Sequence, residues 1–188
     1  MERDRNDSAQ FTIAIDEYVL TCVPNGLPAM FETYVQQAAL VDCINLNDRD
    51  QHCCVLVART SQPWPFMVVA QSFSPSGGGF APGLLLAPDT GRLFIGAGDQ
   101  LLAYDLVAPS RIWLDRTFFG FWGWARHGDV VVLSAELELA AWTATGAKLW
   151  TAPVEPPWVY SVEGDTVFLD VMGVMSQFPL RVGPEYET

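Results

Sequence analysis

The sequence predicts a mainly β protein made of short antiparallel strands, with one short helix near its N-terminus. Two observations favour this fold. A glycine opens a short apolar strand three times, at Gly91, Gly128 and Gly164, so the repeat steps are 37 and 36 residues. A polar turn and a second strand follow each time, and the first two copies add a third strand that ends in Trp113 or Trp150. A repeat of roughly 40 residues with several short strands is typical of propeller blades.

Within the repeats, alternating apolar and polar residues predict seven strands, each antiparallel to its neighbour in sequence. An apolar residue also stands six positions before each opening glycine, at Leu85, Trp122 and Trp158, which indicates a packing position common to all units. The expected strands are 92–96, 100–105, 130–134, 137–143, 148–151, 166–171 and 174–180.

Two segments carry a more specific pattern, Ala103-Tyr104-Asp105 with Arg111-Ile112-Trp113, and the run from Ala141 to Trp150 with its Thr145-Gly146 turn and Lys148. Over residues 84–182 the pattern resembles the PQQ-like, quinoprotein-type propeller repeat. The second copy departs from it, with Thr143 where the repeat has Asp, and the first copy lacks the Thr-Gly turn. The resemblance implies blade geometry. Propellers have ~4–8 blades, and this chain holds three or four units, so we expect a partial or small propeller, or a sandwich-like arrangement.

The N-terminal part, 11–73, is less regular. Phe11–Ile15 alternates as a strand does, and Tyr18–Val23 either continues it or forms the second arm of a tight pair. Apolar residues at helical spacing predict a helix over 28–44, with one long strand from Met30 to Val41 as the alternative. Further strands are expected at Cys53–Ala58 and Phe66–Ala70, with Pro63–Pro65 as a break between them. A glycine-rich stretch at 74–79 marks an internal boundary within a single domain, 1–188.

The composition excludes several classes of function. The net charge is −12 and the ten Lys and Arg residues are scattered, so no basic footprint for nucleic acid exists. No apolar run approaches the length that spans a bilayer, and no apolar segment follows the charged N-terminus as in a secretion signal. We therefore expect a cytoplasmic protein with reduced thiols and no membrane contact. The acidic surface favours a basic protein partner, or it serves solubility alone.

The sequence offers no convincing catalytic or metal site, and we expect no enzyme activity, no cofactor and no metal. Neighbouring cysteines on a strand, such as Cys53 and Cys54, point to opposite faces and do not share one ion with His52. The resemblance to quinoproteins brings a second reading of this pair, a vicinal disulfide against a cofactor, which a chain this short does not support. The Asn and Asp residues of 45–50 lack the glycine and glutamate of a calcium loop. His127 is expected in an exposed turn.

The most unusual feature is the aromatic run from Phe118 to Trp124. Strand alternation sends Phe119 and Phe121 to one face and Trp122 and Trp124 to the other, so one pair is expected to face outward as a binding anchor. The alternative is that all of them pack in the core. Glu136 and Glu138 are expected on one solvated strand face. The residues predicted to bind a partner are therefore the aromatic residues Phe119, Phe121, Trp122 and Trp124, with the acids Asp129, Glu136, Glu138 and Glu163 as a rim.

These features lead to one preferred function and one alternative. The preferred function is a non-enzymatic protein-binding module, such as an inhibitor or an immunity protein that occludes a basic toxin. The alternative is a remnant or subunit of a propeller-type enzyme whose small-molecule site forms only on oligomerisation. Because three or four units leave free sheet edges, we expect either that the N-terminal part covers the open side or that the chain forms a homodimer.

Overall fold

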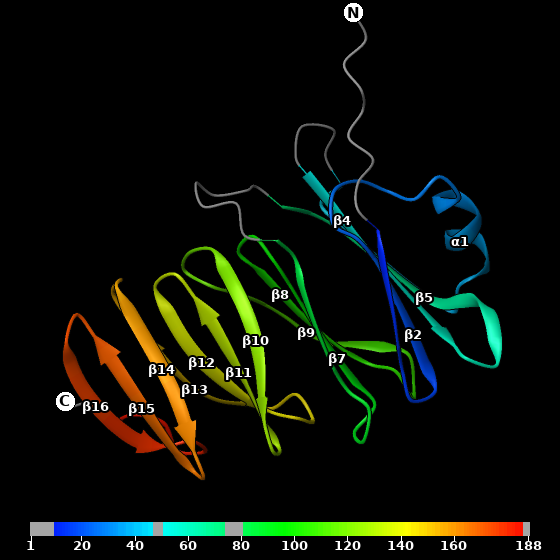
Figure 1. Cartoon of the computed structure of the whole chain (residues 1–188). Helices are drawn as coiled ribbons and strands as arrows, with labels where there is room; N and C mark the ends of the chain where they lie inside the picture. The colour runs from blue at the N-terminus through cyan, green and yellow to red at the C-terminus, as the bar shows by residue number, and fades with distance from the viewer. Residues whose placement is uncertain (1–9, 47–50, 74–80, 186–188) are drawn as a thin grey trace, which may run out of the picture. The chain divides into compact units, whose positions relative to one another are not determined.

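The computed structural model describes residues 10–46, 51–73 and 81–185 (Figure 1). Its contacts divide the chain into two compact units, Met1–Ser74 and Pro75–Thr188. The division falls at the glycine-rich stretch that the sequence marks as an internal boundary. That stretch and most of the 45–50 loop lie outside the described residues. A single domain over 1–188 stays a prediction.

The N-terminal unit is built on one five-stranded sheet. Four of its strands are antiparallel to their neighbours, and β3 alone runs parallel, along β5. Tyr18–Val23 therefore forms the second arm of a hairpin. The four antiparallel strands make a blade-like meander, into which the chain between β2 and β4 inserts α1 and β3. In order across the sheet, the strands are β1 (Phe11–Ile15), β2 (Tyr18–Val23), β4 (Gln51–Arg59), β5 (Gln62–Phe73) and β3 (Leu40–Ile44).

The helix is shorter than the sequence predicts. α1 spans Phe31–Gln37 and not 28–44, and the alternative of one long strand is also wrong. Ala38 takes an extended conformation with ψ of 144°, after which Leu40–Ile44 pairs with the edge of β5. Free backbone groups on that edge therefore outweigh continuation of the helical pattern. The expected apolar stripe does pack against the sheet, through Phe31, Tyr34, Val35 and Ala38.

Strand β5 begins earlier than expected, because the prolines do not break it. Its ladder with β4 jumps from the pair Arg59–Gln62 to the pair Val57–Met67. Pro63–Pro65 lies in the resulting bulge, where the ladder requires no N–H donor.

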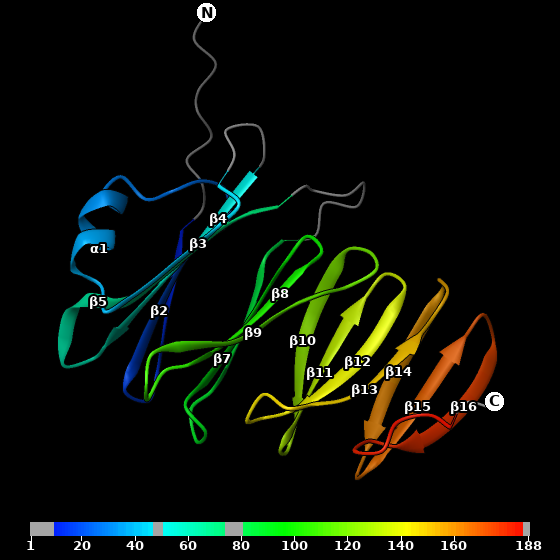
Figure 2. The same ribbon diagram turned by 180° about the vertical axis from the view of Figure 1, so that it is seen from behind.

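The C-terminal unit consists of three consecutive antiparallel meanders (Figures 1 and 2). We call them sheet B, sheet C and sheet D. Sheet B contains β6 (Gly83–Ala87), β7 (Arg92–Ala97), β8 (Gln100–Asp105) and β9 (Ser110–Arg116). Sheet C contains β10 (Phe121–His127), β11 (Val130–Ala135), β12 (Glu138–Thr143) and β13 (Lys148–Pro153). Sheet D contains β14 (Trp158–Glu163), β15 (Thr166–Val171) and β16 (Val174–Pro179).

The mainly β fold and all seven strands predicted within the repeats are confirmed. The sequence did not identify the first strand of each sheet, although Leu85, Trp122 and Trp158, its recurring apolar positions, lie on β6, β10 and β14. The opening glycines Gly91 and Gly128 both have φ of +62°. That left-handed conformation explains why glycine recurs at the turn between the first and second strands.

The sheets of this unit pack face to face. One core lies between sheets B and C and includes Phe94, Leu133 and Trp142. A second lies between sheets C and D and includes Leu139 and Phe178. Sheet C is therefore covered on both faces, which explains why β12 is apolar throughout its middle.

One tryptophan links sheet B to sheet C, and another links sheet C to the chain that follows sheet D. The indole Nε1 of Trp113 on β9 donates to Gly146 O in sheet C over 2.6 Å, and Nε1 of Trp150 on β13 donates to Leu180 O, beyond β16, also over 2.6 Å. A Cβ atom on Gly183 would lie 2.5 Å from Trp150 Cγ, whereas one on Gly146 would reach no atom nearer than 3.4 Å. Both glycines have positive φ, +98° at Gly146 and +82° at Gly183.

This difference yields a paired prediction. Gly146→Ala is expected to lower the free energy of unfolding by about 1 kcal/mol, the usual cost of placing a side chain in the left-handed region. Gly183→Ala meets the same cost and also forces the Trp150 ring to move, so we expect a further loss of about 1–3 kcal/mol. Urea unfolding followed by tryptophan fluorescence measures both variants. Equal losses would show that the ring does not depend on the missing Cβ.

Candidate functional site

Successive turns of a meander lie at opposite ends of its sheet, and this places the candidate residues at two separate ends. One, the Phe118 end, carries turns and links at 98–99, 117–120, 136–137, 154–157 and 172–173. Backbone hydrogen bonds join them in sequence, such as Thr117 N to Asp99 O and Met172 N to Pro157 O. The other, the Asp129 end, carries the turns at 128–129, 144–147 and 164–165, where Ala144 N donates to Asp129 O.

The aromatic run does not alternate as predicted. Phe121 is only 1% exposed, because its ring fills a slot between two glycines that pair across β6 and β7. A Cβ atom on Gly96 would lie 2.3 Å from this ring, and one on Gly83 would lie 2.7 Å from it. A bulge between Phe121 and Gly123 then shifts the register, so that Phe121 and Trp124 contact the same core. The expected split between odd and even positions is therefore wrong.

Neither predicted anchor pair faces outward as a pair. Trp122 is half-buried and stacks on Trp158 with ring centroids 5.1 Å apart and planes inclined by 8°. Trp124 is half-buried against Phe94 and Trp142. Of the predicted aromatic residues, only Phe119 is exposed, at 49%.

The link between β9 and β10 pushes two phenylalanine rings into solvent. Thr117 Oγ1 donates to Phe119 O, and Phe121 N donates to Gly98 O over 2.7 Å, which holds both ends of the link. Phe118 N donates to Glu138 Oε2 over 3.3 Å. With its backbone held in this way, Phe118 is 77% exposed, the most exposed large apolar side chain among the described residues.

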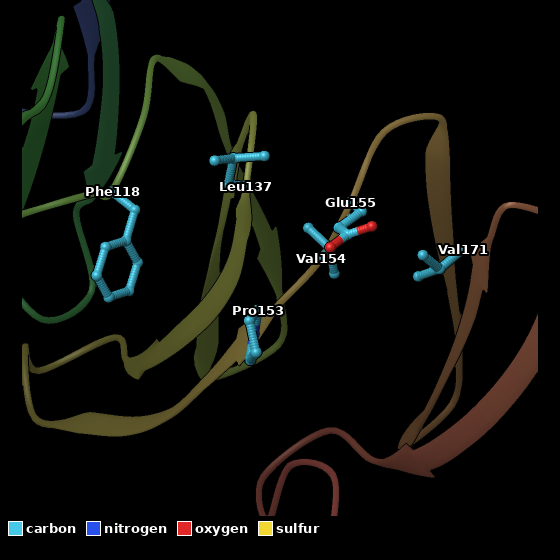
Figure 3. Close-up of a pocket in the computed structure, with 6 residues that line it drawn as sticks. All are labelled: Phe118, Leu137, Pro153, Val154, Glu155 and Val171. Carbon is cyan, nitrogen blue, oxygen red and sulfur yellow. The ribbon is translucent and has the colours of Figure 1, made fainter.

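Phe118 borders an apolar groove at this end of the C-terminal unit (Figure 3). The groove has a volume of about 510 Å³. Figure 3 shows Phe118 on the β9–β10 link at one side and Val171 on β15 at the other, with the remaining residues between them. A carboxylate, Glu155, is the charged group in the lining. The groove is lined by Phe118, Leu137, Pro153, Val154, Glu155 and Val171.

A second hollow lies beside sheet D at the same end. Its volume is about 430 Å³, and Met172 in the β15–β16 turn and Val159 on β14 contribute exposed apolar side chains to it. Asp170 lines it as well, and the Asp170 carboxylate accepts a hydrogen bond from Gly173 N over 2.7 Å. The Phe118 end therefore presents apolar surface interrupted by single carboxylates.

The four predicted rim acids do not surround one centre. Glu136 lies at the Phe118 end, where its backbone N–H donates to Gly120 O. Asp129 lies at the opposite end and forms an ion pair with Arg181. Glu163 is the last residue of β14, next to the 164–165 turn at that same end. The predicted ring of acids around an aromatic centre is wrong because the alternating direction of the strands separates its members.

The fourth rim acid is buried. Glu138 is 2% exposed, so the solvated face expected for Glu136 and Glu138 is wrong at this position. Sheet C lies between two other sheets and has no solvated face there. Burial raises the pKa of the Glu138 carboxyl above its usual value, and nearby Asp115 raises it further, while the Phe118 N–H and Lys148 oppose the shift. Glu138 thus acts as a support for the Phe118 link and not as part of a rim.

The two histidines and the cysteines form no metal site among the described residues, where no three His, Cys, Asp or Glu side chains lie close enough to share an ion. Cys53 and Cys54 do point to opposite faces, as predicted. Cys53 Sγ lies 4.0 Å from Cys22 Sγ, and Cys54 packs in the cluster below α1. His127 is half-buried on β10, with its ring 6.3 Å from Tyr160, and not in an exposed turn. Burial lowers its pKa.

Sequence reasoning missed Phe118, Leu137 and Glu155 as site residues. Phe118 was seen only as part of the aromatic run, and the other two lie in short segments without a motif. One signal was available. Strand direction alternates in a meander, so the repeat spacing alone places 118, 137 and 155 at one end.

In the part of the chain that the structure describes, no helix is long and apolar enough to cross a membrane.

The raised pKa of Glu138 predicts how stability depends on pH. A carboxyl that binds its proton more tightly when folded weakens the fold as pH rises from the unfolded pKa, about 4.3, through the folded pKa. Glu138→Gln removes this loss, so the variant is expected to gain stability relative to wild type as pH rises from 4 to 7. Urea unfolding at several pH values measures the difference, with Ser161→Ala, which changes no titratable group, as control. A difference that stays constant or reverses would contradict the buried carboxyl.

Comparisons with known proteins find similarity in structure alone. No known protein family and no curated protein matches the sequence. The chain is similar to the computationally designed Ika8 protein, with 12% identity, a TM-score of 0.49 and coverage of 92% of this chain and 46% of that one. It is also similar to BamB from Moraxella catarrhalis, with 9% identity, a TM-score of 0.46 and coverage of 90% of this chain and 42% of that one. A third similar structure is the β-propeller domain of the Trilobed protease from Pyrococcus furiosus, with 6% identity, a TM-score of 0.47 and coverage of 86% of this chain and 48% of that one. The chain thus spans less than half the length of each of these three structures.

Proposed function

We propose that this protein binds a basic protein through the groove at the Phe118 end. One observation carries the proposal: Phe118 is 77% exposed beside an apolar groove of about 510 Å³, and its backbone is held in place by a buried carboxylate. Because its backbone is held, Phe118 loses less conformational freedom on binding than a residue of a mobile loop would. Aromatic residues of this kind dominate the binding energy of protein interfaces.

The charges of the Phe118 end favour a basic partner. The turns and links that form this end contain Asp99, Glu136 and Glu155 and no Lys or Arg. Asp99 pairs with Arg116 over 2.7 Å, whereas among the described residues neither Glu136 nor Glu155 has an ion-pair partner. An overall charge of −12 adds a long-range attraction that speeds the encounter with a cation.

The proposal extends to the biological role and the cellular location of the protein. A non-enzymatic protein of this charge that occupies a basic surface acts as an inhibitor or an immunity protein, and we place it in the cytoplasm, where its four cysteines would remain thiols. The similarity of its repeats to PQQ-like blades is part of this proposal as architecture alone, without a cofactor. Phe119 and Glu136, predicted from the sequence, are the chain neighbours of the lining residues Phe118 and Leu137, and the proposal includes them with Phe118 and Glu155 as binding residues.

Affinity capture from a cell extract tests the proposal, with wild-type protein and the Phe118→Ala/Glu155→Gln variant immobilised in parallel. We expect a basic protein to be retained by wild type and released by salt. Phe118→Ala alone should weaken its affinity by about 30-fold, since truncating a central aromatic contact costs about 2 kcal/mol or more. Glu155→Gln should mainly slow association and reduce its salt dependence.

Val107→Ala is the matched control, because Val107 is 67% exposed in the β8–β9 turn at the Asp129 end. It should leave retention and both rates unchanged. If the wild-type and double-variant columns retain the same proteins, the groove is not the binding site. If the specific partner is an acidic protein, the predicted preference for a basic partner is wrong.

A further inference from the structure

Among the described residues, sheet D has three strands, whereas sheets B and C have four. In those sheets β9 and β13 complete the meander by pairing with the third strand, β8 or β12. Among the described residues, the equivalent third strand of sheet D, β16, pairs with β15 alone. We propose that the free edge of β16 accepts an extended, basic segment of a partner protein as a fourth strand.

The backbone of β16 is suited to this addition. Val171 and Val174 close a two-residue turn and therefore form a hydrogen-bonded pair, and such pairs alternate along an antiparallel ladder. Ser176 and Phe178 then bond to β15, whereas Met175 and Gln177 direct their N–H and C=O groups to the free edge. Pro179, which has no N–H, also falls on an outward position, as this alternation requires.

Apart from Pro179 at its C-terminal end, the edge carries none of the usual protection against strand addition. Natural edge strands carry lysines, bulges or inward charges that prevent pairing. β16 reads Val-Met-Ser-Gln-Phe-Pro, has no charged residue, and pairs with β15 without a register shift. Val174 and Met175 are 71% and 64% exposed.

A hollow runs along this strand and shows where side chains of an added strand would lie. Its volume is about 380 Å³, and β16 forms one wall. The other wall is the segment after β16, which contributes exposed Val182 and the carboxylate of Glu185. The hollow is lined by Ser176, Gln177, Phe178, Pro179, Val182, Gly183, Pro184 and Glu185.

The completed sheets indicate which residues an added strand should carry. In both, a basic residue of the fourth strand lies across from the aromatic residue near the end of the third: Arg111 faces Tyr104, and Lys148 faces Trp142. Lys148 Nζ lies 5.2 Å from the Trp142 ring centroid. In sheet D the matching aromatic residue is Phe178, and the hollow beside it contains Glu185. A basic side chain opposite Phe178 would therefore meet a carboxylate.

Charge also decides against a second copy of this chain as the occupant. Residues 155–185 contain five carboxylates, at 155, 163, 165, 170 and 185, and one base, Arg181, which gives a net charge of −4. Pairing β16 with β16 of another copy would bring two such regions together without a positive group on either strand. A basic segment instead gains from the same charges.

This inference rests on the proposed function for the charge of the partner but uses a surface other than the groove. Adding a strand is a common mode of peptide recognition, in which backbone hydrogen bonds provide affinity and side-chain pockets provide selectivity. Main-chain pairing at β16 and side-chain contact at Phe118 are therefore separable by mutation.

The test uses the full chain and a blocked synthetic peptide of the sequence Gly-Ala-Lys-Leu-Trp-Thr-Ala-Pro, which is residues 146–153 of this protein. We expect saturable binding, measured by NMR shifts that centre on β16. A peptide with Lys148→Glu should bind several-fold more weakly, as should wild-type peptide to the Glu185→Gln protein. Gln177→Pro removes an outward N–H and should reduce affinity by about tenfold or more.

Two N-methylated peptides test strand pairing without changing the protein, so they remain informative if Gln177→Pro disturbs the fold. Methyl groups on Leu149 or Trp150 N lie on opposite edges of a strand, so one peptide should lose binding and the other should keep it. Equal binding of both, or no saturable binding of the unmodified peptide, would overturn the inference. Self-association of wild type that Gln177→Pro abolishes would assign the edge to a second copy and overturn it too.

The groove provides an independent control. Phe118→Ala should bind the peptide as wild type does. If the peptide fails to bind while Phe118-dependent capture of a basic protein persists, the strand inference falls and the proposed function stands. If capture fails while peptide binding persists, the reverse holds.

Discussion

The C-terminal unit depends on aromatic rings that occupy the place of an absent side chain in the neighbouring sheet. Phe121 fills the slot between Gly83 and Gly96, and Trp150 rests on Gly183. Trp113 completes the series with its hydrogen bond to Gly146 O. A ring against a glycine backbone lets two sheets approach closely and removes apolar area from water, and the indole N–H also satisfies a turn carbonyl. Glycine is thus required for space at Gly83 and Gly96, for conformation at Gly146, and for both reasons at Gly183.

This packing determines which aromatic residues remain for other uses. Phe121 enters the slot, and Trp122 stacks on Trp158, so both are committed to holding sheets together. The link before them has to turn from β9 into β10 while Phe121 N bonds to Gly98 O. Phe118 then has no core to enter and remains in solvent above an apolar groove. The exposed ring is a consequence of how closely sheets B and C are joined, and the same contacts hold the backbone that carries it.

The repeat made the strands of the C-terminal unit predictable, because glycine turns and alternating apolar residues report local conformation directly. The position of side chains within a strand was less predictable. Alternation failed at Phe121 because one bulge reverses the faces of all residues before it. It failed at Glu138 because a polar residue in an alternating strand is expected on a solvent-exposed face, whereas sheet C is covered on both faces. In the N-terminal unit, helical spacing identified α1 but extended it through Leu40–Ile44, where pairing with β5 is a tertiary effect that no local pattern contains.

The two proposed surfaces recognise different parts of a partner. The groove at the Phe118 end offers apolar side chains and one carboxylate, so it selects side chains. The edge of β16 offers backbone groups of Met175 and Gln177, so it selects an extended conformation, and Glu185 adds a preference for charge. Both belong to regions rich in carboxylates, and a partner with a basic extended segment is attracted to each by the same field. Under both proposals, the negative charge of the chain attracts the partner to both surfaces.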